Sequence, residues 1–253
     1  MAKGLKYFIG NWKMFGIPSS IKILDRIDEY FKKNRNHNSK YKIIIAVPFT
    51  LLESFSKRFK NKNIIISAQN CHYNNNFGAY TGSINSFMIK KMNINYTIIG
   101  HSENRATGES DKIIEKKVSS AMSNNFNIIF CIGENYLEKR NKKTLSVLKK
   151  QMSTVLKKKY NFKKIFIAYE PIWSIGTGKV PQRNDLMKIS NFVKNFVKKR
   201  FKLNHKPKFI YGGSVDKKTV LDFKTINELD GFLIGGASKS SKKFIDIIKN
   251  FYK

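Results

Sequence analysis

The sequence predicts an α/β fold, a closed eight-stranded parallel (β/α)8 barrel that forms a single domain over residues 1–253. Eight short apolar runs recur along the chain, and segments with helical periodicity separate most of them. This alternation implies parallel strands joined by right-handed crossovers. Eight such units without a linker or a break in composition favour a closed barrel over an open doubly wound sheet.

The eight predicted strands have strand length and are rich in β-branched or aromatic residues. Their near-continuous hydrophobicity indicates strands that are covered on both faces, as in parallel sheets. In chain order they are KYFIGNW (6–12), KIIIAVP (42–48), NIIISAQN (63–70), YTIIGHS (96–102), NIIFCIGE (127–134), KIFIAYEP (164–171), KFIYGGS (208–214) and GFLIGG (231–236).

Apolar residues at helical spacing predict helices between most of these strands. The predicted helices cover residues 21–31, 51–59, 111–122, 142–160, 185–201 and 217–223. Most of the strands end in a polar residue or in glycine. In a barrel those ends converge on one rim, where active sites are built. They are Asn11, Gln69, His101, Glu134, Glu170, Gly212 with Gly213, and Gly235 with Gly236.

The chain is strongly basic, with 49 Lys and Arg residues against 17 Asp and Glu residues and a formal net charge of +32. Such a charge can indicate a nucleic acid or an anionic surface as partner. The lysines, however, are scattered over the whole chain on polar helix faces, which is typical of solvated surfaces. Lys, Asn and Ile are abundant together, as codon usage in an AT-rich genome would favour. We therefore expect no specific nucleic-acid partner.

Two cysteines, Cys71 and Cys131, are too few for a disulfide framework and lie in no CxxC pair or zinc-like cluster. The apolar runs are far shorter than a membrane span, and the first residues lack the long apolar region of a signal peptide. These features predict a cytoplasmic protein without a membrane partner.

Glu170 follows an apolar strand and precedes Pro171, which holds its backbone extended at the rim. A carboxylate that enters a partly dry rim suits a general base. The segment after it, PIWSIGTGK, lacks the spacing of a phosphate-binding P-loop. Its apolar start and its flexible glycine-rich end are typical of a loop that closes over a site as a lid.

His101 precedes SENR, which opens toward a helix, so it faces the positive end of the helix dipole. This position disfavours the protonated form and leaves a neutral imidazole that can donate a hydrogen bond. Lys13 and Asn11 follow the first strand on the same rim. The paired glycines after the last two strands leave amide N–H groups free for an anion, and barrels frequently bind phosphate there.

The sequence resembles the triosephosphate isomerase family, the family for which the TIM barrel is named. The resemblance runs through nearly the whole chain, in GNWKM, AQN, GAYTG, IIGHSENR, GES, CIGE, AYEPIWSIGTGK, YGGSV and DGFLIGGAS. It implies interconversion of dihydroxyacetone phosphate and D-glyceraldehyde 3-phosphate through an enediolate, in glycolysis and gluconeogenesis. It implies no metal and no organic cofactor.

The resemblance also implies a role for each residue of the site. Glu170 would shuttle the proton, His101 would polarise the substrate oxygens, and Lys13 with Asn11 would stabilise the enediolate. Lys13 would also stabilise the phosphate, which would bind the amides of Gly176, Ser214, Gly235 and Gly236, and Asn11 would help to bind the substrate. Supporting roles fall to Ser102, which holds Glu170 while the lid is open, to Tyr211, which latches the lid, and to Ile175 and Leu233, which cover the carboxylate.

Two positions depart from the family pattern. The family usually has Arg where this chain has Asn104, and Glu where it has Ser83. In the family these charges pair across a dimer interface, with the loop around Thr81 beside the partner's lysine. Since both charges are replaced together, no single charge is left unpaired, and we expect a homodimer with a weakened or purely neutral contact there.

Two other functions compete with this reading. Another phosphate-binding barrel isomerase would not combine Lys13, His101 and the EPIWSIGTGK lid. A decayed barrel that binds polyanions is supported only by the net charge of +32, and the residues expected to do the chemistry are intact.

Overall fold

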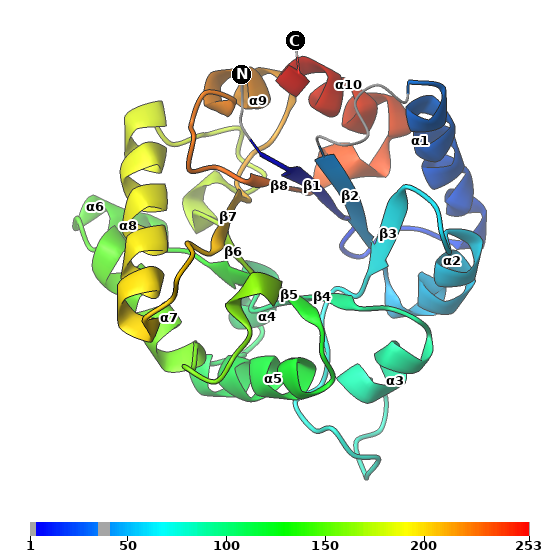
Figure 1. The fold of residues 1–253 in the computed structure, drawn as a ribbon, viewed down its shortest axis with the longest axis horizontal. Coiled ribbons are helices and arrows are strands. Elements are labelled where there is room, and N and C mark those ends of the chain that lie inside the picture. Colours follow the sequence, from blue (N-terminus) through cyan, green and yellow to red (C-terminus); the bar gives the residue numbers. More distant parts are fainter. Residues whose placement is uncertain (1–3, 35–40, 253) are drawn as a thin grey trace.

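The computed structural model describes residues 4–34 and 41–252, so residues 1–3, 35–40 and 253 of the predicted domain lie outside the described residues. Within the described ranges, eight parallel strands surround a central axis and helices cover their outer side (Figure 1). All eight predicted strands are confirmed. They are β1 (Lys6–Asn11), β2 (Tyr41–Ala46), β3 (Ile64–Ser67), β4 (Tyr96–Ile99), β5 (Asn127–Ile132), β6 (Ile165–Tyr169), β7 (Lys208–Tyr211) and β8 (Gly231–Ile234).

The strand order β3-β2-β1-β8-β7-β6-β5-β4 leaves β3 and β4 as the two ends of the sheet. Ala68, directly after β3, joins them. Its N–H donates to the Tyr96 carbonyl at 2.9 Å, and its carbonyl accepts from the Ile98 N–H at 3.0 Å. These two bonds complete the ring, so the predicted barrel is confirmed.

The six predicted helices are also confirmed, as α1 (Ile21–Lys33), α2 (Leu52–Arg58), α5 (Asp111–Ser123), α7 (Thr144–Val155), α8 (Arg183–Phe201) and α9 (Lys217–Phe223). Helix α7 is shorter than the predicted 142–160 because the backbone becomes extended at Leu156. The prediction gave no bounds for four helices, α3 (Ser86–Lys91), α4 (Ser102–Ala106), α6 (Tyr136–Arg140) and α10 (Ser241–Tyr252), although it expected a helix after His101, where α4 begins. The first three are single turns that begin at the side-chain caps of Asn85, His101 and Asn135.

The core has two parts, one inside the barrel and one between the barrel and its helices. On β1, Ile9 belongs to the inner cluster and Phe8 to the outer one, and both side chains are fully buried. Alternate residues therefore serve the two clusters, which explains the continuous hydrophobicity of the strands. The packed interior leaves the carboxyl-terminal rim as the place where polar side chains gather.

Candidate active site

The rim at the carboxyl ends of the strands holds a cavity of about 320 Å3. Asn11 from β1, His101 from the end of β4 and Glu170 from the end of β6 line it, together with Lys13. The first three are 5%, 5% and 2% exposed. The structure thus brings the four residues expected to do the chemistry to one buried place.

Hydrogen bonds hold Glu170 through its backbone N–H and through its carboxylate. Its N–H donates to the Ile132 carbonyl at 2.7 Å, which fixes the backbone against β5. Its Oε1 lies 3.3 Å from His101 Nε2, and its Oε2 accepts the backbone N–H of Ser102 at 3.3 Å. Ser102 thus contacts the carboxylate through its backbone amide.

Gly212 makes room for that carboxylate. A Cβ at position 212 would lie 2.9 Å from Glu170 Cγ and 3.4 Å from Leu233 Cβ. Leu233 is buried at 3% exposure, and Ile175 lines the same cavity from the lid. The two apolar residues expected around the carboxylate therefore lie at the cavity that contains it.

The hydrogen bonds of His101 indicate which ring nitrogen carries the proton. Nδ1 accepts the backbone N–H of Glu103 at 3.2 Å, a donor that cannot reverse its role, while the Glu103 carboxylate is 3.7 Å from Nδ1. The neutral ring therefore carries its proton on Nε2, the nitrogen that faces Glu170. The arrangement presents an uncharged N–H donor beside a carboxylate.

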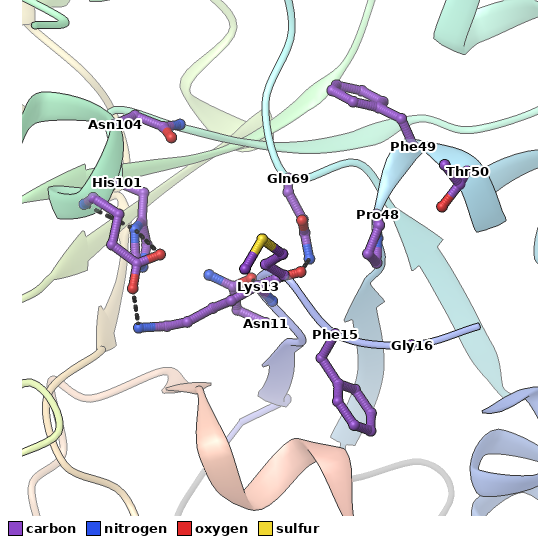
Figure 2. Close-up of a pocket in the computed structure, with 12 residues that line it drawn as sticks. Asn11, Lys13, Phe15, Gly16, Pro48, Phe49, Thr50, Gln69, His101 and Asn104 are labelled. Carbon is purple, nitrogen blue, oxygen red and sulfur yellow. Dashed lines mark hydrogen bonds and ion pairs between the residues drawn. The ribbon is translucent and has the colours of Figure 1, made fainter. Parts of the chain in front are cut away.

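Lys13 has a left-handed backbone, with φ of 57°, which is uncommon outside glycine. Three hydrogen bonds hold this conformation. Its N–H donates to Asn11 Oδ1 at 3.0 Å, and its carbonyl accepts from Gln69 Nε2 at 2.9 Å and from the Phe15 N–H at 3.0 Å. Figure 2 shows Gln69 directed at the Lys13 backbone. The clamp aims the lysine side chain across the rim.

The Lys13 ammonium pairs with Glu103 Oε1 at 2.6 Å. Partial burial opposes ionisation of Glu103, but the hydrogen bond and charge of Lys13, together with the charge of Lys239, outweigh it and lower the pKa of this carboxyl. A charged Glu103 therefore fixes the position of Lys13. Sequence reasoning missed Glu103, because nothing in SENR shows that the lysine after β1 reaches it.

The glycine pairs after β7 and β8 lie against the cavity as expected. Gly176, Ser214, Gly235 and Gly236 all line it. A Cβ at Gly235 would lie 3.6 Å from Lys13 Cε, so the backbone closely approaches the lysine. Backbone amides and an ammonium group together suit a phosphate.

The lid is anchored at its first turn by Trp173. The indole Nε1 donates to Glu134 Oε1 at 2.9 Å, and Tyr169 OH donates to the same oxygen at 3.1 Å. The Lys139 ammonium lies 3.2 Å from the centroid of the Trp173 ring. Burial raises the pKa of Glu134, and the two donors oppose that rise. Sequence reasoning noted Glu134 as a polar strand end and assigned it no role.

A second cavity, of about 550 Å3, adjoins the first and shares Asn11, Lys13 and His101 with it (Figure 2). Its remaining lining includes Met14, which is 99% exposed, and Asn104. Figure 2 shows Phe49 and Pro48 on the side opposite His101. This hollow leads from the surface to Lys13.

Both cysteine thiols are free and buried. Burial raises the pKa of Cys71 to about 12, and burial together with nearby Glu170 raises the pKa of Cys131 well above its ordinary value. Because the thiolate is the reactive form, these shifts disfavour reaction of either thiol near neutral pH.

In residues 4–34 and 41–252, no group of three or more His, Cys, Asp or Glu side chains is placed to hold a metal ion. The same residues contain no helix with the length and apolar content to span a membrane.

Residues 6–251 match the family model described as triosephosphate isomerase. The chain is 36% identical over 250 residues to the triosephosphate isomerase of Dictyoglomus thermophilum, covering 97% of this chain and 99% of that one. It is 36% identical over 249 residues to the enzyme of Mycoplasma mobile, covering 96% and 99%. The crystal structure of triosephosphate isomerase from Bartonella henselae superimposes with a TM-score of 0.88 at 32% identity, covering 98% of this chain and 99% of that one.

Proposed function

Since this chain belongs to the triosephosphate isomerase family, we propose that Glu170 is the base of its reaction. The enzyme interconverts dihydroxyacetone phosphate and D-glyceraldehyde 3-phosphate, a step of glycolysis and gluconeogenesis. The observation that carries the proposal is the buried pair of the Glu170 carboxylate and His101 Nε2, 3.3 Å apart in the cavity.

In the proposed mechanism the Glu170 carboxylate removes a proton from carbon 1 of dihydroxyacetone phosphate. The electron pair moves into an enediolate, and the same carboxyl returns a proton to carbon 2. One base suffices because both carbons lie side by side. The Nε2–H of His101 donates to the substrate oxygens as negative charge develops on them.

Lys13 and Asn11 stabilise the same charge. The Lys13 ammonium attracts both the enediolate and the phosphate. Asn11 turns its Oδ1 to the Lys13 N–H, which leaves its Nδ2 as a donor for substrate. The lid keeps water from the enediolate, with Ile175 and Leu233 around the carboxylate and Tyr211 against the lid. No metal or organic cofactor takes part in this scheme.

The substrate phosphate binds the amide N–H groups of Gly176, Ser214, Gly235 and Gly236. Gly236 gives the cleanest test because it is the first residue of a short 3-10 helix, Gly236–Lys239, where its N–H has no carbonyl partner within the helix. A proline there prefers an extended preceding residue, whereas Gly235 has a ψ of −104°, so the melting temperature of each variant is measured beside its inhibition. Gly236→Pro removes one N–H. Gly236→Ala is the matched control, since a Cβ there meets nothing within 4 Å.

Inorganic phosphate should compete with glyceraldehyde 3-phosphate in the wild-type enzyme. A hydrogen bond to a charged group contributes about 1.5–3 kcal/mol, so Gly236→Pro should weaken phosphate inhibition by roughly 10- to 150-fold. Gly236→Ala should change it by less than about twofold. If phosphate inhibited both variants equally, the Gly236 N–H would not be a donor to the phosphate.

We also propose that two copies of the chain form a homodimer. The segment between β3 and α3 projects from the barrel at the bottom of Figure 1, with Phe77 77% exposed and Thr81 exposed beside it. The cavity beside Lys13 exposes Met14 at its mouth. A projecting loop and a hollow on one chain can pair reciprocally about a two-fold axis. The loop around Thr81 of each copy would enter the other copy's cavity.

A pair of substitutions tests this dimer. Asn104 lines the cavity and Ser83 is exposed on the loop, so their contact carries no charge. Asn104→Arg alone should weaken the dimer because it buries an unpaired cation, and adding Ser83→Glu should restore association. Sedimentation at nanomolar protein should show about twice 29.3 kDa for the wild type and the double variant. Monomers only in the wild type would contradict the dimer.

We place the working enzyme in the cytoplasm, as a single domain. The two free cysteines suit a reducing compartment. The scattered lysines give no reason to propose a specific nucleic-acid partner.

A further inference from the structure

The hydroxyl of Ser174 lies at the centre of the contacts between the lid and the turn that follows β7. Ser174 is fully buried. Its Oγ donates to the Lys179 carbonyl at 2.5 Å, lies 3.1 Å from Tyr211 OH, and is 3.2 Å from the Ser214 amide nitrogen. A hydroxyl has one hydrogen and two lone pairs. Since the hydrogen goes to Lys179, Ser174 Oγ accepts from both Tyr211 OH and the Ser214 N–H.

Two further bonds join the same pieces of chain. Ser214 Oγ donates to the Ser174 carbonyl at 2.7 Å, and the Gly178 N–H donates to Ser214 Oγ at 3.2 Å. Gly213 permits this approach, because a Cβ there would lie 2.3 Å from Tyr211 OH and 2.5 Å from Ser174 Oγ. Five hydrogen bonds in all therefore involve Ser174 or Ser214 where the lid meets the turn after β7.

The Ser214 N–H is also one of the proposed phosphate donors. It has a single hydrogen, so a linear bond to phosphate requires it to leave Ser174 Oγ. A phosphate oxygen carries charge and forms stronger hydrogen bonds than a hydroxyl does. Phosphate can therefore displace the hydroxyl, and the displacement subtracts from the affinity for phosphate.

We propose that the Ser174 hydroxyl competes with the substrate phosphate for the Ser214 amide. It occupies the Ser214 amide until phosphate takes that donor. Ser174 is a positioning residue, since it acts on substrate through Ser214. The inference rests on the proposed phosphate site.

The test compares the inhibition constant of inorganic phosphate in the wild type and in Ser174→Ala. The variant frees the Ser214 N–H, so phosphate should bind about 2- to 10-fold more tightly, the factor that a net neutral hydrogen bond of about 0.5–1.5 kcal/mol represents. A purely structural role predicts the opposite direction, because a loosened lid would weaken phosphate binding.

Thr177→Ala is the matched control. The Thr177 hydroxyl bonds to the carbonyls of Trp173 and Ser174 and accepts from the Lys179 N–H, all within the lid. Its removal loosens the lid and leaves the Ser214 amide engaged, so it should not tighten phosphate binding. Unchanged or weaker phosphate inhibition in Ser174→Ala would overturn the inference.

Amide hydrogen exchange at Ser214 gives a second readout that does not depend on turnover. Without phosphate, this amide should exchange faster in Ser174→Ala than in the wild type, and added phosphate should protect it in both proteins. Equal exchange in the two phosphate-free proteins would overturn the inference. If phosphate neither competes with substrate nor protects Ser214 in the wild type, the phosphate site fails, and the inference fails with it.

Discussion

Glu170→Gln should lower kcat by about 10² to 10⁴, the usual contribution of a general base. The amide has almost the shape of the carboxylate, so the cavity, the Ser102 N–H contact and the fold should persist. What is lost is the basicity of the carboxylate, because a neutral amide is too weak a base to remove the proton. A coupled assay of glyceraldehyde 3-phosphate conversion measures the loss, and KM should change far less than kcat.

Glu170→Asp separates the need for a carboxylate from the need for its position. The shorter side chain keeps the base and withdraws it by about 1 Å, a displacement that can cost on the order of 10²-fold. We therefore expect activity between those of the wild type and Glu170→Gln. If Glu170→Gln retained wild-type kcat with an unchanged melting temperature, another group would have to be the base.

Lys13→Met should lower kcat by roughly 10² to 10³, the cost of removing one preorganised group that stabilises a developing oxyanion. The ammonium is the cation at the cavity that holds Glu170 and His101, and Glu103 fixes it there. Its loss should also raise KM, because phosphate binds beside it. The steady-state constants of the purified variant measure both effects.

Lys239→Met is the matched control for Lys13→Met. Lys239 lies near the same rim, with its ammonium 5.2 Å from the Phe15 ring centroid, and it lines neither cavity. Lys239→Met also removes one positive charge near the rim. It therefore tests whether the loss of activity in Lys13→Met comes only from a weaker attraction of the anionic substrate. Similar losses in both variants would show that Lys13 acts only through the net positive charge.

The barrel and the location of the site were predictable from sequence for a physical reason. Parallel strands that alternate with helices bring their carboxyl ends to one rim, so Glu170 and His101 were expected together although 69 positions separate them. Their side chains indeed lie 3.3 Å apart. The same rule predicted the glycine pairs after β7 and β8 beside the cavity.

The partners of those residues were not predictable, because they depend on how far individual side chains reach. Gln69 and Asn11 hold Lys13 in a left-handed conformation, and from there its ammonium meets Glu103. The hydroxyl of Ser174 accepts the N–H of Ser214, which is 40 positions away in the sequence. Periodicity contains no information about such contacts.

Helix α10 was also not predicted, although its sequence contains the signal for a helix. Phe244, Ile247, Ile248 and Phe251 have helical spacing and form its buried face. That signal is present in the sequence, and the prediction ended one helix too early. In Figure 1, α10 lies between α9 and α1 and completes the outer ring.

The central claim is that Glu170 moves the proton through an enediolate, and solvent isotope incorporation tests it most directly. Dihydroxyacetone phosphate is converted in D₂O, and the product is trapped as it forms and analysed for deuterium at carbon 2. A proton held on a carboxyl group exchanges with solvent, so we predict deuterium at carbon 2 with the wild type and a loss of this labelling rate in Glu170→Gln. Turnover without any deuterium at carbon 2 would indicate direct hydrogen transfer between the carbons and would contradict the account.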